Sequence, residues 1–178
     1  VEGAASEEAR RELAHILAWS EKVNRAVKEI VQGIPPFPYV RGSLVKLQDR
    51  ADVVVVSATP IEALKREWQE HDVARYTALI CGQEMGTKTE HIASIAGGYA
   101  ENHVLMIGDA PGDRMAAMAN DALFYPIIPS DEEISWKDFI NEVMELFFSE
   151  GYAGRYEANL SERFERALPD SPPWEVIT

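Results

Sequence analysis

Apolar positions near the start of the chain recur at the spacing of one face of a helix. The residues that share this face are Leu13, Ile16, Leu17, Val23, Val27 and Ile30. Ser6 can cap such a helix, and Glu7 and Glu8 stand in the first turn, where acidic side chains are favoured. We therefore expect one amphipathic helix over residues 6–31. The Pro-rich stretch 35–38 then breaks the pattern and predicts a linker.

Continuous apolar runs alternate with helical patterns over the rest of the chain. The runs, which predict strands, cover residues 53–56, 78–81, 104–107 and 123–128. The helical patterns cover residues 42–49, 60–71, a segment that begins near Thr87, and residues 111–119, 132–149 and 155–167. Strands buried on both faces have continuous apolar runs, and helices between them imply right-handed parallel crossovers. The pattern predicts an α/β fold, a Rossmann-like three-layer α/β/α sandwich around a parallel sheet.

The chain length of 178 residues fits one domain of ordinary size with a small appendage. An apolar fraction of 46% and a charged fraction of 26% are near globular averages, so a folded chain is expected. We expect three parts: a helical segment over residues 1–35, a core over residues 36–130, and C-terminal helices within residues 131–178 that pack on the core. The closing Pro-rich stretch, 169–174, is expected to be a C-terminal tail.

The chain is strongly acidic, with a formal net charge of −13 at pH 7. A nucleic-acid partner needs a basic face, so this charge argues against nucleic-acid binding. A small phosphorylated ligand stays compatible with the charge, because one bound divalent cation can dominate the local field. Cys81 is the only cysteine, so the sequence offers no internal disulfide.

Neither membrane insertion nor secretion is indicated by the sequence. The longest apolar stretches, 53–56 and 122–128, are too short to cross a bilayer. No basic-then-apolar start resembles a signal peptide, so we expect a cytoplasmic protein. The first residue is Val1 rather than Met, from which we expect that this sequence is a piece of a longer chain.

Polar side chains follow three of the predicted strands. Ser57 comes directly after the first strand, Lys88 stands at the start of the helix after the second, and Asp109 and Asp113 follow the third. In open parallel sheets the ligand binds beyond the carboxyl ends of the strands, so these residues are expected at one rim. Two carboxylates suit Mg²⁺, whereas a hydroxyl and the N–H groups of a helix start suit phosphate oxygens.

These residues, in this order, resemble a known family. The apolar strand ending at Ser57, the isolated Lys88 and the Gly-Asp-Xaa-Xaa-Xaa-Asp signature at 108–113 are similar to motifs two, three and four of the haloacid-dehalogenase-like (HAD) hydrolase superfamily. The stretch 36–41 resembles the segment in which the chain of that family re-enters the core from a helical cap. The resemblance covers residues 36–128 of this chain.

The resemblance implies a Mg²⁺-dependent phosphatase of a small phosphorylated metabolite. Ser57, Ala58 and Lys88 would bind the phosphoryl group, and Lys88 would also neutralise the charge of the nucleophile. Asp109 would bind Mg²⁺, and Asp113 would support either the metal or Lys88. The reaction implied is attack by an aspartate on phosphorus, followed by hydrolysis of the acyl phosphate.

Motif one of the family, an Asp-Xaa-Asp pair that supplies the nucleophile, is absent from the whole sequence. The helix over residues 6–31 would then be the remnant of a cap inserted after motif one, and this chain alone is expected to be inactive. In that fold the strand of motif one lies between the strands at 53–57 and 104–108. These two strands are therefore expected about 9–10 Å apart, without direct pairing.

Other functions are considered beside the phosphatase. A HAD-like pseudoenzyme or scaffold would keep the phosphate contacts without turnover, and the choice depends on residues before Val1. A receiver-type signalling domain uses similar residues, but its acidic pair precedes the hydroxyl and its lysine comes last. A dehalogenase needs no Mg²⁺, so the acidic pair disfavours it.

The stretch 86–89 is no P-loop, because Thr87 interrupts the Gly-Lys-Thr sequence. The four histidines lack metal-ligand spacing and are expected at the surface.

Overall fold

The computed structural model describes residues 6–30 and 33–168, and the chain divides into two compact units, Val1–Pro35 and Pro36–Thr178. The first unit contains α1 (Glu7–Ile30). Its predicted cap is confirmed, since Ser6 Oγ accepts a hydrogen bond from Ala9 N at 3.2 Å. Among the described residues, no helix combines the length and the apolar character needed to cross a membrane. The stretch 169–174, expected to be a tail, lies outside the described residues.

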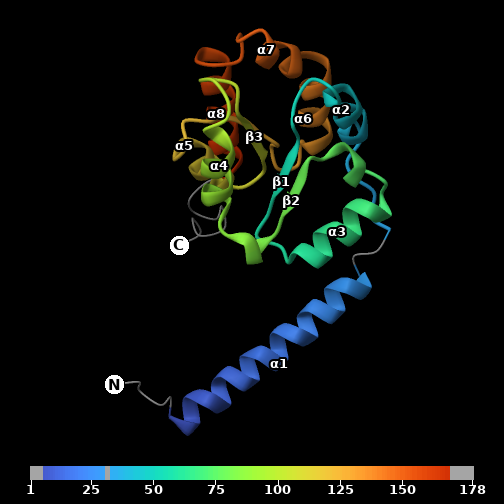
Figure 1. Cartoon of the computed structure of the whole chain (residues 1–178), viewed down its shortest axis with the longest axis vertical. Coiled ribbons are helices and arrows are strands. Elements are labelled where there is room, and N and C mark those ends of the chain that lie inside the picture. The colour runs from blue at the N-terminus through green and yellow to red at the C-terminus, as the bar shows by residue number, and fades with distance from the viewer. Residues whose placement is uncertain (1–5, 31–32, 169–178) are drawn as a thin grey trace, which may run out of the picture. The chain divides into compact units, whose positions relative to one another are not determined.

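The second unit alternates strands and helices (Figure 1). The strands are β1 (Val54–Val56), β2 (Leu79–Cys81), β3 (Leu105–Gly108) and β4 (Leu123–Pro126). The helices are α2 (Val40–Leu47), α3 (Ile61–Glu70), α4 (Lys88–Ala96), α5 (Pro111–Met118), α6 (Glu132–Asp138), α7 (Met144–Phe148) and α8 (Arg155–Ala167). A π-helical turn, Phe139–Val143, joins α6 to α7, so the single regular helix predicted over 132–149 is interrupted.

The four strands form two parallel pairs. β1 pairs with β2 with Val55 opposite Ile80, and β3 pairs with β4 with Met106 opposite Phe124. The mixed α/β class and the parallel orientation agree with the sequence prediction. The described residues nevertheless contain two small sheets instead of one continuous sheet. β1 and β3 do not pair with each other among these residues, as expected for strands separated by a further strand.

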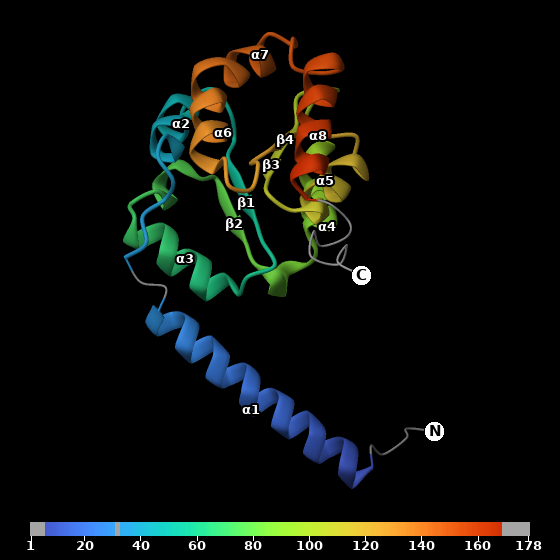
Figure 2. The ribbon, with the colours of Figure 1, turned by 180° about the vertical axis from the view of Figure 1, so that it is seen from behind.

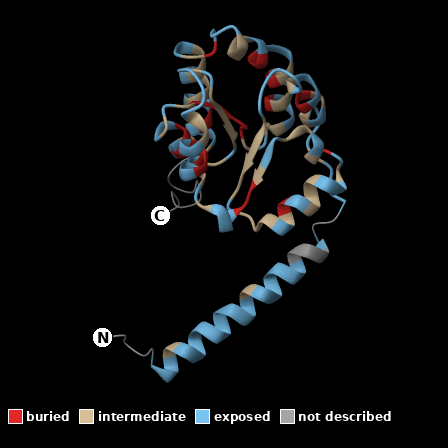
Figure 3. Ribbon diagram, in the orientation of Figure 1, coloured by how far each residue is buried: buried red, intermediate tan, exposed pale blue. Residues whose placement is uncertain are grey.

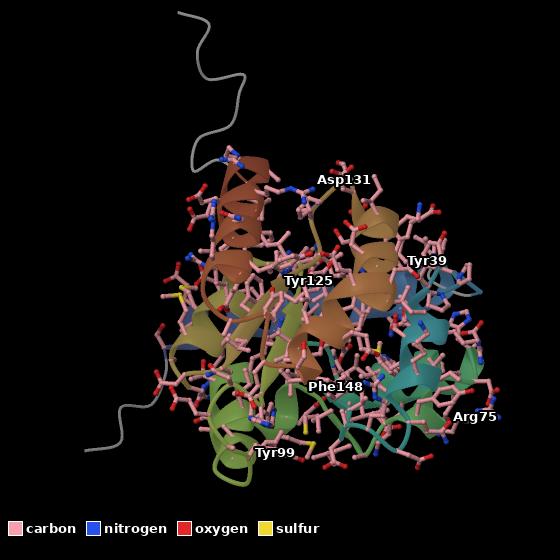
Figure 4. The ribbon with its side chains drawn as sticks, turned by 90° about the horizontal axis from the view of Figure 1, so that it is seen from above. Tyr39, Arg75, Tyr99, Tyr125, Asp131 and Phe148 are labelled. Atoms are coloured by element: carbon pink, nitrogen blue, oxygen red, sulfur yellow. The ribbon has the colours of Figure 1, made fainter. Side chains whose placement is uncertain are left out.

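Helices cover both faces of β4, whose four residues are all buried. On one face, the Tyr125 ring packs against the Phe139 ring with centroids 5.4 Å apart, and the Tyr152 ring lies edge-on to the Tyr125 ring. On the other face, Phe124 packs edge-on against Phe164 of α8, with centroids 5.6 Å apart. Figure 3 shows β4 as buried and β1 and β3 as intermediate, and Figure 4 places Tyr125 among the packed side chains of the interior. The main core of the second unit therefore lies around β4.

Side chains close the outer edge of β4. Alternate residues of β4 bond to β3, so the N–H and C=O of Phe124 point away from that strand. Glu157 Oε1 accepts the hydrogen bond of Phe124 N at 2.7 Å, and Tyr152 Oη donates to Phe124 O at 2.6 Å. Burial raises the pKa of the Tyr152 hydroxyl far above its usual range, so the group stays a donor at neutral pH. The sheet thus ends at β4 without an unpaired backbone group at Phe124.

We expect Tyr152→Phe to lower the free energy of unfolding by about 1–3 kcal/mol, because the buried carbonyl of Phe124 loses its donor while the ring stays in place. The control is Tyr99→Phe, since the Tyr99 hydroxyl donates to Asp52 Oδ2 at 2.5 Å in an exposed setting where water can replace it. The control should change stability by less than about 0.5 kcal/mol. Urea unfolding of both variants checks this, and equal effects would contradict the role of Tyr152 at the strand edge.

Candidate active site

The four predicted catalytic residues follow the carboxyl ends of parallel strands. Ser57 comes directly after β1, and Asp109 directly after β3. Lys88 is the first residue of α4, which follows β2, and Asp113 lies in the first turn of α5. Because the strands in each pair are parallel, their carboxyl ends lie at the same edge of that pair.

An ion pair joins the two strand pairs at this edge. Lys88 Nζ donates to Asp113 Oδ1, and Asp113 Oδ2 accepts a hydrogen bond from Ala110 N at 3.2 Å. The side chain of Asp113 is 3% exposed and that of Lys88 is 29% exposed. A buried carboxylate is tolerated only when it is paired and hydrogen-bonded, and here both oxygens have partners. Asp113 therefore fixes the ammonium group of Lys88 at the rim.

Gly108, the glycine of the Gly-Asp-Xaa-Xaa-Xaa-Asp signature, is required because a larger side chain would clash with Asp113. A Cβ atom at Gly108 would lie 2.5 Å from the Cβ and the Cγ of Asp113, closer than real Cβ contacts. Only a glycine at the end of β3 lets the carboxyl group of Asp113 lie against the strand and reach Lys88. The spacing of the signature thus follows from the packing of α5 on β3.

Ser57 is held at the end of β1 by both its backbone and its side chain. Its N–H donates to Cys81 O at 3.1 Å, and its Oγ accepts a hydrogen bond from Thr59 N at 3.1 Å. The side chain therefore caps a local turn, and its hydroxyl proton is left to donate to a ligand. Ala58 is exposed beside it.

A carboxylate that the sequence analysis did not select lies at the start of α3. Glu84 Oε2 accepts the hydrogen bond of Ile61 N at 3.0 Å, across 23 residues of sequence. A Cβ at Gly82 would lie 2.6 Å from Ile61 N, so this glycine permits the close approach. No local sequence pattern indicates such a long-range cap.

The two predicted metal ligands, Asp109 and Asp113, differ in whether their carboxylate oxygens already have hydrogen-bond partners. Asp109 is exposed, and no described residue hydrogen-bonds its side chain, whereas both oxygens of Asp113 are used within the protein. No group of three or more His, Cys, Asp or Glu side chains within residues 6–30 and 33–168 could hold an ion. Mg²⁺ keeps several waters and uses one or two carboxylates. Asp109 thus fits the role of the single protein carboxylate that binds Mg²⁺.

One histidine departs from the surface position that the sequence analysis expected. His91, one turn after Lys88 in α4, is only 8% exposed, and its Nε2 has no hydrogen-bond partner in the described part of the chain. Its burial depends on how α4 packs against neighbouring elements such as α5, which no local sequence pattern reports. The expectation of a surface residue is therefore wrong for His91.

The structure thus brings two of the four predicted residues into contact, Lys88 and Asp113. Ser57 and Asp109 lie at the carboxyl ends of β1 and β3, and neither hydrogen-bonds to the Lys88–Asp113 pair within the described residues. The chain matches no protein-family model, no curated protein and no solved structure in comparisons with known proteins. The interpretation of the site therefore rests on the geometry of these residues.

We expect Lys88→Met to lower the free energy of unfolding by about 1–3 kcal/mol, because it leaves the buried carboxylate of Asp113 without its cation. Replacing Asp113 as well, in Lys88→Met/Asp113→Leu, should recover much of the loss. A double-mutant cycle in urea should therefore give a coupling energy of about 1–3 kcal/mol.

The matched control for this cycle is the exposed pair Arg166 and Glu162, at 3.8 Å in α8. Its coupling should stay below about 0.5 kcal/mol, because solvent screens both groups. A coupling as small as this between Lys88 and Asp113 would contradict the assigned role of their ion pair.

Proposed function

We propose that this chain is the larger part of a HAD-like phosphomonoester hydrolase acting on a small phosphorylated metabolite. In this proposal the two strand pairs belong to one Rossmann-like three-layer α/β/α sandwich. The observation that carries the proposal is the Lys88–Asp113 ion pair at the carboxyl edge of both strand pairs. Ser57 and Asp109 at neighbouring strand ends supply the hydroxyl donor and the free carboxylate that such a site needs.

Lys88 is suited to hold a phosphate group. Its ammonium has three donors, of which Asp113 takes one, so two can point to phosphoryl oxygens or to an attacking carboxylate. The ion pair fixes the ammonium before the ligand arrives, and pre-oriented charge is the main source of transition-state stabilisation in such sites. The Ser57 hydroxyl and the N–H of Ala58 would donate to the same phosphate.

The reaction proposed is a double displacement at phosphorus. A carboxylate oxygen forms a bond to phosphorus, and the bond from phosphorus to the alcohol oxygen breaks as that oxygen takes up a proton. Water then attacks the phosphorus of the acyl phosphate, which releases inorganic phosphate and restores the carboxylate. The attacking carboxylate is not supplied by this sequence, which contains no Asp-Xaa-Asp pair.

Mg²⁺ is proposed to bind at Asp109, where it would neutralise charge on the phosphate oxygens. Asp113 acts in this scheme through Lys88, since both of its oxygens are already bonded. Asp113 is thus a positioning residue, and Asp109 is the residue expected to touch the ion.

A second candidate function is phosphate binding without turnover, as in a pseudoenzyme or scaffold. The absence of Asp-Xaa-Asp from the sequence favours this function for the chain on its own. Both candidates expect no hydrolysis of p-nitrophenyl phosphate by this chain alone. Turnover by the isolated chain would contradict both, because it would require a nucleophile among its own residues.

We expect calorimetry to show Mg²⁺ binding in the presence of inorganic phosphate and 100 mM KCl, and Asp109→Asn to abolish it. The control is Asp121→Asn, an exposed carboxylate just before the amino end of β4 and so away from the carboxyl ends of the strands, which should leave the binding heat unchanged. This control is needed because a chain with a net charge of −13 attracts cations non-specifically. Unchanged Mg²⁺ binding in Asp109→Asn would contradict the metal assignment.

Lys88→Arg should weaken phosphate binding in the same titration by about tenfold, or about 1.4 kcal/mol, because a planar guanidinium cannot replace a compact ammonium beside Asp113. Phosphate affinity equal to that of the unmodified chain would contradict a role for Lys88 in binding the ligand.

A further inference from the structure

The chain segments that follow β1 and β2 are bonded to each other beyond the ends of the strands. We call residues 57–60 the β1 turn and residues 82–87 the β2 loop. Gln83 N in the β2 loop donates to Thr59 O in the β1 turn at 3.1 Å. Figure 2 shows the ends of β1 and β2 side by side at the edge where α3 begins. The contact between the two strands therefore continues into the turn and the loop.

A second bond between these segments is made by the side chain of Glu84. α3 begins with Ile61, and the residue before it is Pro60, which has neither a backbone N–H nor a side-chain acceptor to cap the helix. Glu84 Oε2 accepts the hydrogen bond of Ile61 N at 3.0 Å instead. The helix that follows the β1 turn is thus capped from the β2 loop.

The β1 turn carries two of the groups to which the proposed function assigns the phosphate. Ser57 Oγ accepts a hydrogen bond from Thr59 N at 3.1 Å, so its hydroxyl proton is left to donate. The N–H of Ala58 lies in the same turn and has no acceptor within the described residues. Both donors precede the bond that Glu84 makes, so a shift of the turn would move both of them together.

The other end of the β2 loop determines where α4 starts. Gly86 has a φ of +132°, a conformation that other residues rarely adopt, and it turns the chain towards α4. Thr87 Oγ1 then accepts a hydrogen bond from Glu90 N at 3.2 Å, and Glu90 Oε2 accepts one from Thr87 N at 2.7 Å. Lys88 is the first residue of α4. The loop from Glu84 to Lys88 is therefore held at both of its ends.

Glu84 affects a bound phosphate in two opposite ways. Its hydrogen bond to Ile61 N holds the β1 turn in place, whereas its negative charge repels an anion. Because Glu84 is exposed, solvent and salt screen this repulsion. The hydrogen bond acts directly on the position of the backbone, so we expect its effect to be the larger one.

We propose that Glu84 is a positioning residue of the phosphate site, which holds the β1 turn in the position that binds phosphate. The inference rests on the proposed function, because it adds a residue to the same site. Glu84 acts through Ile61 N and needs only a hydrogen-bond acceptor for this role. An uncharged acceptor should therefore serve as well as the carboxylate.

The test compares Glu84→Gln, which removes the charge and keeps an acceptor, with Glu84→Ala, which removes both. Calorimetric titration of the whole chain with inorganic phosphate in excess Mg²⁺ measures the affinity. We expect Glu84→Gln to bind phosphate as tightly as the unmodified chain, or up to about twofold more tightly, because the screened repulsion is gone. Glu84→Ala should bind about three- to tenfold more weakly than Glu84→Gln, the factor that corresponds to one hydrogen bond.

The matched control is Glu62, an exposed carboxylate in the first turn of the same helix. No described residue hydrogen-bonds its side chain, so it shares the charge of Glu84 but not the bond to Ile61. Glu62→Ala and Glu62→Gln should therefore agree in phosphate affinity to within about twofold. A difference between Ala and Gln that appears only at Glu84 isolates the acceptor from the charge.

Hydrogen exchange of the Ile61 amide reports the bond without any ligand. This amide should be protected in the unmodified chain and in Glu84→Gln, and it should exchange at least about tenfold faster in Glu84→Ala. The amide of Leu64 should keep its protection in all three forms. Leu64 N donates to Pro60 O at 3.2 Å, so it reports whether α3 stays folded.

The possible failures can be told apart. Equal phosphate affinity in Glu84→Ala and Glu84→Gln would overturn the inference and leave the phosphate site in place, as would rapid exchange of the Ile61 amide in the unmodified chain. Weak binding by both variants would assign the role to the charge and overturn the inference as well. If the unmodified chain and every variant bind no phosphate, the proposed function fails, and the role of Glu84 fails with it.

Discussion

A buried carboxylate needs a positive partner, and this requirement organises the carboxyl edge of the second unit. Asp113 is almost completely buried between β3 and α5, and Lys88 from the other strand pair is its cation. The steric demand at Gly108 and the hydrogen bond from Ala110 follow from placing this carboxyl group at the strand end. The same contact that stabilises the fold thus presents an ammonium group at the rim, where a phosphate oxygen could use it.

Backbone hydrogen bonding imposes the second constraint. At β4 the chain satisfies the outer groups of Phe124 with side chains that lie 28 and 33 residues further along. On the sides of β1 and β3 that point away from β2 and β4, the described residues offer no equivalent. The outer edge of β4 is thus closed by side chains, whereas β1 and β3 each pair on one side only among the described residues.

Much of the fold follows from local patterns in the sequence. The β-branched run before Ser57 and the apolar runs of β3 and β4 predicted strands because buried parallel strands need continuous apolar residues. The helix Arg155–Ala167 has the predicted bounds. The π-helical turn at Phe139–Val143 was not predicted, because the apolar pattern of a helix does not report a single widened turn.

The candidate site was predictable only in part. Lys88 and Asp113 were both selected, but only the structure shows that they contact each other, since the contact spans 25 residues. Glu84 and His91 were missed, because a cap on a distant helix and the burial of one histidine depend on packing between elements. The assignment of the site to a phosphatase stays a prediction.

The central claim is that the ion pair of Lys88 and Asp113 joins the two strand pairs at their carboxyl ends, while β1 and β3 do not pair directly. Nuclear Overhauser spectroscopy of the chain alone tests it most directly, because backbone protons two strand spacings apart, about 9–10 Å, give no cross-peak. The account predicts cross-peaks within each strand pair and between the side chains of Lys88 and Asp113, and none between the backbones of Val54–Val56 and Leu105–Gly108. Backbone cross-peaks between those two strands would contradict it.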